Sequence, residues 1–138
     1  MKVKFKLDAG AFVPTKAHKQ DAGFDVFARD SKIIRAGCSE IFDTGVHIYI
    51  PDGYAGLLCS KSGLNIKHGL TSEGVIDAGY VGSVCVKLYN NSDESYEVKC
   101  GDKISQLLII PIIDAELEQT DEVPDTERGS AGFGSSGR

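Results

Sequence analysis

Short stretches in which apolar and polar residues alternate recur along this chain. The alternation is clear at 3–7, 46–50, 83–89 and 96–100. Successive side chains of a β-strand point to opposite faces, so a period of two is typical of strands with one buried face. Each stretch is bounded by Gly, Asp, Asn or Pro residues, which favour turns. The pattern predicts an all-β domain of short strands.

Helical periodicity is weak throughout the sequence. No ten-residue stretch shows the 3.6-residue period of an amphipathic helix, and LNIKHG at 64–69 is expected to form at most one helical turn. The length of 138 residues fits one domain, and the 16 glycines fit many turns. We therefore predict a jelly-roll β-sandwich.

The segment ISQLLIIPI at 104–112 departs from this alternation. It is apolar at nearly every position after Gln106. Such a run is typical of a strand that is buried on both faces. It could lie in the centre of the sandwich or at a contact between subunits. We favour the contact, because the chain that follows must then leave the domain.

The last 25 residues differ in composition from the rest. Residues 114–127 hold seven carboxylates and no Lys or Arg, which is typical of a solvated segment. In residues 128–138, seven of eleven residues are Gly or Ser, and such a strip cannot build a core. We predict a domain over 1–113, followed over 114–138 by an acidic linker and a flexible C-terminal arm.

Charge and hydropathy limit the possible partners and the location. The formal net charge is −5, whereas a nucleic-acid-binding protein needs a basic face, so we expect no nucleic acid partner. The longest apolar run, 107–113, is interrupted by Pro111 and is too short to span a membrane. The N-terminus lacks the apolar region of a signal peptide, and we expect a cytoplasmic protein.

The four cysteines of the chain have no metal-binding spacing and are expected to be reduced and buried.

Two short segments carry groups suited to chemistry. In GVIDAGYVG at 74–82, Asp77 precedes Ala78-Gly79, which resembles the tip of a β-hairpin. A carboxylate there can cap the turn or act as a general base, and Tyr80 can be a strand aromatic or a surface for a flat ligand. SKSGL at 60–64 can be an ordinary loop or an anion site.

Taken in order, five segments resemble the motifs of the trimeric deoxyuridine triphosphatases (dUTPases). They are DAGFD (21–25), SKSGL (60–64), GVIDAGYVG (74–82), GDKISQLLI (101–109) and RGSAGFGSSGR (128–138). Five ordered motifs are far more specific than any one of them. The resemblance implies a jelly-roll homotrimer whose active sites each take residues from all three chains. It also implies Mg²⁺-dependent hydrolysis of dUTP to dUMP and pyrophosphate, which limits uracil in DNA and supplies dUMP.

The resemblance implies roles for the residues around the nucleoside. Asp77 matches the catalytic residue, which deprotonates a water for attack on the α-phosphorus. Tyr80 matches the aromatic residue that packs on deoxyribose and excludes a 2′-hydroxyl. Backbone groups contact uracil, and the positions that match this hairpin and its borders are Thr71, Gly74, Val75, Ile76 and Cys85.

Further roles follow for the triphosphate. Asp25 matches a residue that contacts the Mg²⁺ ion through its bound water. The ion itself is held mainly by the triphosphate. The positions that match phosphate contacts in the body of the domain are Lys61, Ser62, Gly63 and Gln106. The arm is expected to close over a neighbouring subunit's site, with Phe133 stacked on uracil. Its γ-phosphate contacts are expected from Arg128, Gly134, Ser135 and Ser136.

The sequence departs from the family pattern at three positions. Lys61 stands where the family usually has Arg, which keeps the charge but loses the bidentate fork. Ala131 and Ser136 replace the more usual Gly and Thr.

Two alternative functions are possible for a protein with this fold. Residues 76–90 also resemble dCTP deaminases, but Lys87 occupies the position of their catalytic Glu, and an ammonium cannot replace that carboxylate. The other alternative is a nucleotide-gated regulatory protein built on a dUTPase frame.

Overall fold

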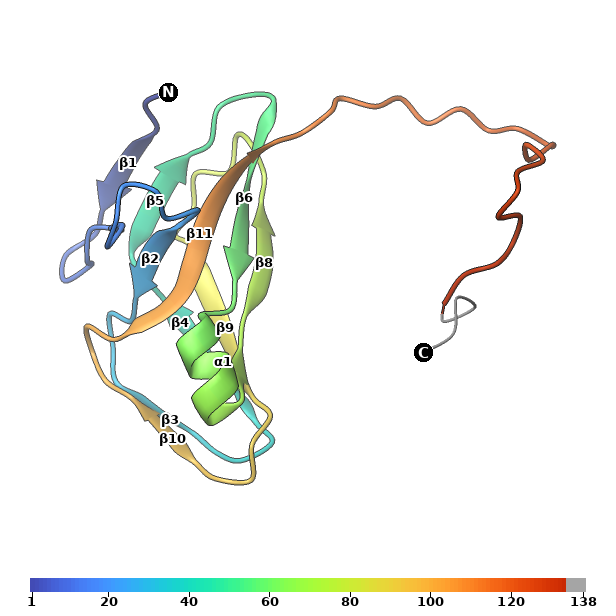
Figure 1. Cartoon of the computed structure of the whole chain (residues 1–138). Coiled ribbons are helices and arrows are strands. Elements are labelled where there is room, and N and C mark those ends of the chain that lie inside the picture. The colour runs from blue at the N-terminus through green and yellow to red at the C-terminus, as the bar shows by residue number, and fades with distance from the viewer. Residues whose placement is uncertain (134–138) are drawn as a thin grey trace.

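The structure is a computed structural model, and it describes residues 1–133. This part of the chain forms eleven strands and one helix, shown in Figure 1. In chain order they are β1 (Lys4–Leu7), β2 (Phe24–Phe27), β3 (Lys32–Ile34), β4 (Ser39–Asp43), β5 (Val46–Tyr49), β6 (Tyr54–Cys59), α1 (Ser62–His68), β7 (Leu70–Thr71), β8 (Glu73–Ile76), β9 (Cys85–Asn90), β10 (Tyr96–Val98) and β11 (Lys103–Pro111).

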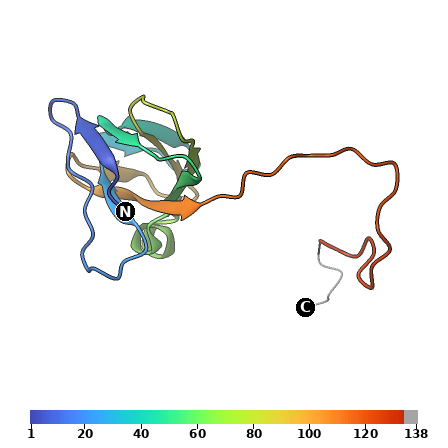
Figure 2. The same cartoon turned by 90° about the horizontal axis from the view of Figure 1, so that it is seen from above.

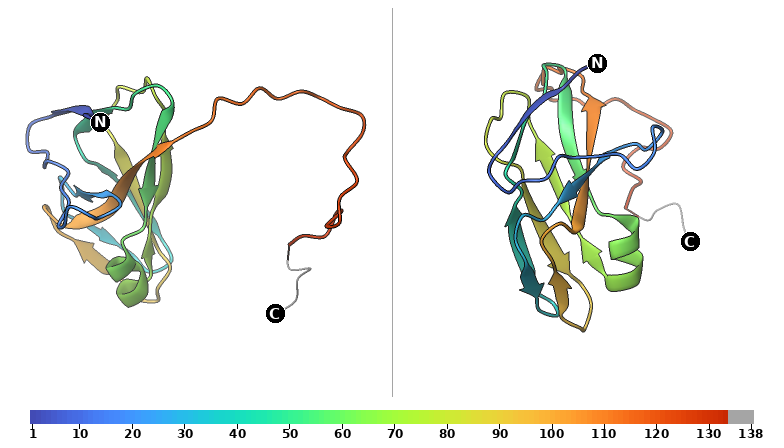
Figure 3. Two further views of the ribbon diagram at one scale, coloured as in Figure 1. Left: turned by 45° about the horizontal axis from the view of Figure 1, so that its top comes forward. Right: turned by 90° about the vertical axis from the view of Figure 1, so that its left-hand side faces the viewer.

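The strands form an antiparallel jelly-roll sandwich, which confirms the predicted fold. One sheet has the order β2-β11-β6-β8 and another has the order β4-β9-β7, while β1 pairs with β5 and β10 with β3. The two views in Figure 3 show these sheets facing each other. Alternate side chains of strands such as β5 and β9 fill the space between them. The largest fully buried ones include Ile34, Phe42, Leu70, Leu88, Ile104 and Leu107.

β11 lies in the middle of the four-stranded sheet. It pairs with β2 on one side and β6 on the other, so its backbone is enclosed by neighbours. Leu107 is buried in the core, whereas Leu108 and Ile110 are half-buried on the other face. The sequence left two places open for this apolar segment, the centre of the sandwich and a contact between subunits. The structure shows it at the centre of a sheet. A contact between subunits on its outer face stays a prediction.

The helix is longer than the sequence pattern indicated. α1 spans seven residues and ends at Gly69, whose φ of 65° and N–H bond to the carbonyl of Asn65 are typical of a C-cap. None of its residues is buried. Because α1 packs no full apolar face into the core, it left no clear helical period in the sequence.

The cysteines are free, but the expectation that they are buried is wrong. Cys38, Cys85 and Cys100 are exposed, and Cys59 is half-buried. The cause is visible in β9, where Cys85 points outward and its neighbour Val86 points into the core. Nowhere in residues 1–133 is a helix long and apolar enough to cross a membrane.

After β11 the chain leaves the sandwich. The N–H of Ile112 still donates to the carbonyl of Gly53 at 2.9 Å, and beyond it residues 114–133 contain no helix or strand. Figures 1 and 2 show this segment running away from the sheets. Its apolar side chains are exposed, including Leu117, Val123 and Phe133.

Candidate active site

The predicted turn after Asp77 is present, but it does not join a β-hairpin. The N–H of Tyr80 donates to the carbonyl of Asp77 at 3.2 Å, and Gly79 takes the positive φ of 83° that the turn requires. However, β8 pairs with β6, whereas β9 pairs with β4 and β7. The turn therefore carries the chain from one sheet to the other, and a slot opens between β8 and β9.

The slot presents backbone groups on one wall. In an antiparallel pair, alternate residues direct their N–H and C=O groups to the partner strand, and the others direct them away. Because β8 is the last strand of its sheet, its outward peptide groups face the slot. The slot encloses about 230 Å³ and is lined by Leu58, Gly74, Val75, Ile76, Asp77, Tyr80, Ser83, Val84 and Cys85. Most residues predicted to contact the nucleoside are thus brought together.

The other wall is the compact loop 80–83 and the start of β9. The hydroxyl of Tyr80 donates to the carbonyl of Ser83 at 3.0 Å, and the ring folds over Gly82. Although Cys85 as a whole is exposed, partial loss of water around its thiol and the nearby carboxylate of Asp43 raise the pKa of that thiol. Cys85 is therefore a neutral wall of the slot at neutral pH and not a nucleophile.

A second cluster of charged residues surrounds Asp25. This carboxylate is buried on β2, and its two oxygens pair with the ammonium groups of Lys61 and, at 2.8 Å, Lys103. Burial acts to raise the pKa of Asp25, but hydrogen bonds and charge from Lys103 and Lys61 outweigh it, and the net pKa lies below the ordinary value. Gln106 lies directly opposite Asp25 across the β11–β2 pair. Sequence reasoning missed Lys103, although it lies in the same motif as Gln106.

Buried hydroxyls fix the backbone that leads into this cluster. Ser60 accepts from the N–H of Ser72 at 2.9 Å and donates to its carbonyl at 3.1 Å. The hydroxyl of Ser72 meets that of Ser105 at 2.9 Å, and Ser105 donates to the carbonyl of Cys59 at 3.0 Å. The hydroxyl of Ser60, next to Lys61, is therefore structural. Ser62 and Gly63 lie exposed in the first turn of α1.

The slot and the Asp25 cluster lie at opposite ends of the same strand pair. Cys59 pairs with Glu73 at one end, and Gly56 pairs with Ile76 at the other. These pairs are three residue steps apart along the strand, which is about 10 Å. Lys61 lies beyond the first end and Asp77 beyond the second. One chain thus keeps the carboxylate of the slot apart from the cations of the cluster.

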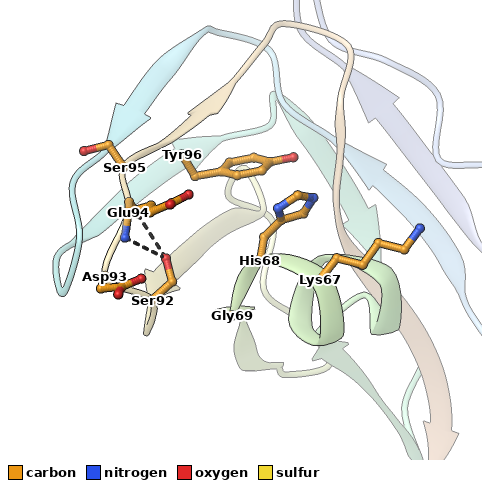
Figure 4. A pocket seen from close by; sticks show the side chains of 8 residues that line it. All are labelled: Lys67, His68, Gly69, Ser92, Asp93, Glu94, Ser95 and Tyr96. Atoms are coloured by element: carbon orange, nitrogen blue, oxygen red, sulfur yellow. Dashed lines mark hydrogen bonds between the residues drawn. The ribbon is translucent and has the colours of Figure 1, made fainter.

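The structure does not bring Thr71 to the slot. Its hydroxyl accepts from the side chain of Asn91 at 3.0 Å, and it lines a separate hollow with Ser60, Ser72, Glu73, Tyr89 and Asn91. A further hollow, shown in Figure 4, lies at the end of α1 and is bordered by His68 and Tyr96, whose ring centres are 4.8 Å apart. None of the predicted site residues lines it.

Two predicted arm residues lie far from both clusters in the described chain. Arg128 donates to the carbonyl of Ala131 at 2.8 Å, within the arm itself. Phe133 is fully exposed and has a φ of 47°. The predicted residues Gly134, Ser135 and Ser136 lie outside the described residues.

A jelly-roll sandwich with a backbone-lined slot, a carboxylate at its rim and a separate lysine cluster has the features that an all-β nucleotide-binding protein needs. A sequence model described as dUTPase matches residues 10–137, and the chain belongs to the dUTPase family.

Named relatives agree with this assignment. The deoxyuridine 5′-triphosphate nucleotidohydrolase of Tropheryma whipplei (strain Twist) is 40% identical over 136 residues, covering 96% of this chain and 93% of the relative. The enzyme of the same name from Candida albicans is 40% identical, covering 91% of this chain and 81% of the relative.

Solved structures show the same likeness. Staphylococcus bacteriophage 80alpha dUTPase with dUpNHpp aligns with a TM-score of 0.92 and 34% identity over 99% of both chains. A mutant dUTPase from phage phi11 of S. aureus, described with a structural Mg(II) ion, aligns with a TM-score of 0.83 and 30% identity over 91% of this chain and all of that one.

Proposed function

We propose that this protein hydrolyses dUTP to dUMP and pyrophosphate, with Asp77 activating the attacking water. Membership of the dUTPase family supports the reaction. The observation that supports the residue is the place of Asp77 at the rim of the slot, beside Tyr80 and the peptide edge of β8. A carboxylate there can accept a proton from water while the nucleotide lies in the slot.

The free edge of β8 is suited to reading a pyrimidine base. Uracil presents an N–H between two carbonyl oxygens, and outward peptide groups offer the complementary C=O and N–H. Cytosine presents an amino donor in place of one acceptor, so buried donors would be left unpaired. Each unpaired group costs about 1–3 kcal/mol. A methyl group added at Gly74 would lie 3.3 Å from the side chain of Leu58, which also lines the slot. Glycine at this position therefore avoids a tight contact beside the peptide edge.

Tyr80 is placed to select the sugar. Its ring lines the same slot as Asp77, and its hydroxyl is already engaged by Ser83. A deoxyribose can pack against this ring, whereas a 2′-hydroxyl would have to displace it. Packed aromatic walls reject such additions because they do not relax without loss of contacts.

The Asp25 cluster is suited to the triphosphate. Lys61 and Lys103 share one buried carboxylate, which leaves one net positive charge for phosphate oxygens. Gln106 lies beside them and adds a neutral donor and acceptor. Two ammonium groups in place of a guanidinium bind phosphate as point charges, without the bidentate geometry of arginine.

Asp25 fits an indirect role toward Mg²⁺. Both of its oxygens already face ammonium groups, but a carboxylate has further lone pairs that can accept from metal-bound water. When bound, Mg²⁺ would neutralise part of the triphosphate charge and keep several of its waters. Asp25 would orient those waters, while the phosphates bind the ion directly.

A complete site requires more than one chain in this proposal. Asp77 and Lys61 lie beyond opposite ends of the β6–β8 pair, so a homotrimer can bring the slot of one subunit to the lysine cluster of another. The extended segment 114–133 can then reach a neighbouring subunit, with Phe133 and Arg128 closing over the nucleotide. The dCTP deaminase alternative lacks its carboxylate, because Lys87 stands there and lies over the Tyr89 ring at 4.9 Å.

Product analysis tests the reaction. The purified protein is incubated with Mg²⁺ and, separately, dUTP, dCTP, dTTP or UTP. We expect dUMP and pyrophosphate from dUTP alone, and no turnover after the metal is chelated. Ammonia released from dCTP would instead establish the deaminase, and no turnover of any nucleotide would contradict the proposal.

Subunit mixing tests the shared site. Asp77→Asn and Lys61→Ala chains, each inactive alone, are co-expressed with different tags and purified through both. Mixed trimers should regain part of the activity, because some sites draw both intact residues from different chains. If doubly tagged trimers form and stay inactive, the division of the site between chains is wrong.

A regulatory role is a second candidate. The 80alpha phage dUTPases are described as controlling transfer of virulence genes by a G protein-like mechanism, and this chain shares their fold over nearly its whole length. If this protein also signals, closing of the arm on nucleotide would change its surface. A pull-down with and without dUpNHpp tests this, and capture that ignores the nucleotide would contradict it.

A further inference from the structure

The two ring nitrogens of His47 face two acceptors. His47 lies on β5, and its Nδ1 is 2.8 Å from the carbonyl oxygen of Val81. Its Nε2 is 3.1 Å from a carboxylate oxygen of Asp8, which follows β1. A neutral imidazole carries a single N–H, whereas an imidazolium carries two. Only the protonated ring can donate to both oxygens at once.

The surrounding charges favour that protonated form. The bond to the Val81 carbonyl and the bond and charge of Asp8 raise the pKa of His47, while Lys6 and burial oppose them. Asp8 also lies 4.0 Å from Lys6 and 3.9 Å from Arg29, and Arg29 in turn pairs with Asp43 at 3.1 Å. These are the charged groups that face the ring from β1, β4 and the loop before β3.

The contact made by His47 falls on the loop that carries Tyr80. Val81 is the next residue after Tyr80, and the loop 80–83 has two outside attachments. His47 holds the carbonyl of Val81, and Asp43 accepts from the hydroxyl of Ser83. Ser83 also accepts the hydroxyl of Tyr80 through its carbonyl. The orientation of the Tyr80 ring therefore depends on how firmly this loop is held.

We propose that His47 is a positioning residue for sugar selection, which as an imidazolium anchors Val81 and so fixes the Tyr80 ring in the slot. This inference rests on the proposed function, because it takes Tyr80 as the ring against which the sugar packs. It adds a residue outside the five motifs and outside the lining of the slot.

The anchor has a defined pH dependence. Its full strength is present below the ordinary pKa of histidine, about 6.5. Because the folded-state pKa is raised, the ring loses one of its two N–H groups as the pH rises through that higher value. The remaining proton is then shared between the Nδ1 and Nε2 tautomers, so the carbonyl of Val81 is held for only part of the time. A less firmly held Tyr80 should discriminate less between deoxyribose and ribose at high pH.

Kinetics with the trimer in Mg²⁺ test this. We would measure kcat/KM for dUTP and for UTP between pH ~5.5 and ~9, the range around histidine titration. The ratio removes effects of pH that are common to both substrates. For the unaltered protein the ratio should fall about tenfold across the range, the size expected for one hydrogen bond to a charged group. His47→Gln should give a flat ratio, because Gln donates a bond without titrating.

His68→Gln is the matched control, because it removes a histidine that lies far from the slot and should leave the fall intact. Asp8→Asn should move the midpoint of the fall to lower pH. A flat ratio in the unaltered protein, or the same fall in His47→Gln, would overturn the inference.

NMR separates this inference from the proposed function. The ring nitrogens of His47 and the backbone amides of Val81 and Gly82 are followed by pH titration without substrate. In the unaltered protein, the chemical shifts of these amides should change with the same midpoint pH as the His47 ring nitrogens. In His47→Gln this change should be absent. If dUTP is not hydrolysed but the amides follow His47, the reaction is wrong and the anchor stands. If the amide shifts do not change as His47 titrates, the proposed anchoring of Val81 is wrong, whether or not dUTP is hydrolysed.

Discussion

The hydroxyl of Tyr80 lies so close to Gly82 that a methyl group added at Gly82 would stand 2.3 Å from its oxygen. The ring and the glycine therefore determine each other's position, although neither residue is in the core.

Gly82→Ala should impair sugar selection more than stability. The ring of Tyr80 is half-exposed and can swing away, at the loss of its bond to Ser83. We expect the free energy of unfolding to change by less than about 1 kcal/mol, as for most surface substitutions. The ratio of kcat/KM for dUTP over UTP should fall. In a Tyr80→Ala background, Gly82→Ala should add nothing, and an additive effect would contradict the coupling.

Asp77→Asn should bind nucleotide but hydrolyse it poorly. The amide fills the same space at the rim of the slot but cannot accept a proton from water. Loss of a general base typically costs 10²- to 10⁴-fold, so we expect kcat to fall by about this factor. Calorimetry with dUpNHpp should give an affinity close to that of the unaltered protein. A normal kcat in the Asp77→Asn variant would remove Asp77 from this role.

Asp25 should stabilise the fold in a pH-dependent way. Its folded-state pKa lies below the ordinary value of 3.8, so the stabilisation is fully present above that value. It is lost as the pH falls through the lower folded-state pKa. The free energies of unfolding of the unaltered protein and of Asp25→Asn in urea should therefore differ at pH ~6, and the difference should shrink as the pH falls below the ordinary pKa of Asp. A difference that stays constant with pH would show that ionisation of Asp25 is not its source.

A chain that ends at residue 127 should fold but turn over dUTP slowly. Of the residues removed, 128–133 are described, and their hydrogen bonds join only residues of the segment 126–131, so their loss removes none of the core. The truncated protein should keep its thermal midpoint, and its kcat/KM for dUTP should drop at least about tenfold, since one catalytic closure contributes at least this much. Phe133→Ala should reproduce part of the loss. Full activity of the truncated chain would contradict the closing role of the arm.

The sequence located some of the strands, because alternation is a local property. The strands β1, β5 and β9 all coincide with predicted stretches. The sequence could not predict which strands pair with each other. The turn at Ala78-Gly79 has hairpin residues, yet the strands on either side join different sheets, since pairing is decided by β6 and β4 far along the chain.

The same limit applies to the site. Asp25 and Lys61 were each predicted from motifs, but their ion pair joins residues 36 positions apart. Lys103 lies within a predicted motif and His47 lies in none, and the contacts of both side chains are with residues far along the chain. Ser72 and Ser105 are invisible for the same reason, since buried hydroxyls become important only when their partners are known.

The open edge of β8 bears on how this protein can change over time. Every residue except proline carries the same peptide N–H and C=O groups, so substitutions other than proline at positions such as Val75, whose side chain is exposed, leave the backbone donors and acceptors of the slot in place. A recognition surface of this kind tolerates sequence drift but resists redesign. If the slot binds the base as proposed, a variant that prefers another base would need a different strand path, which insertions or deletions in residues 73–85 could supply.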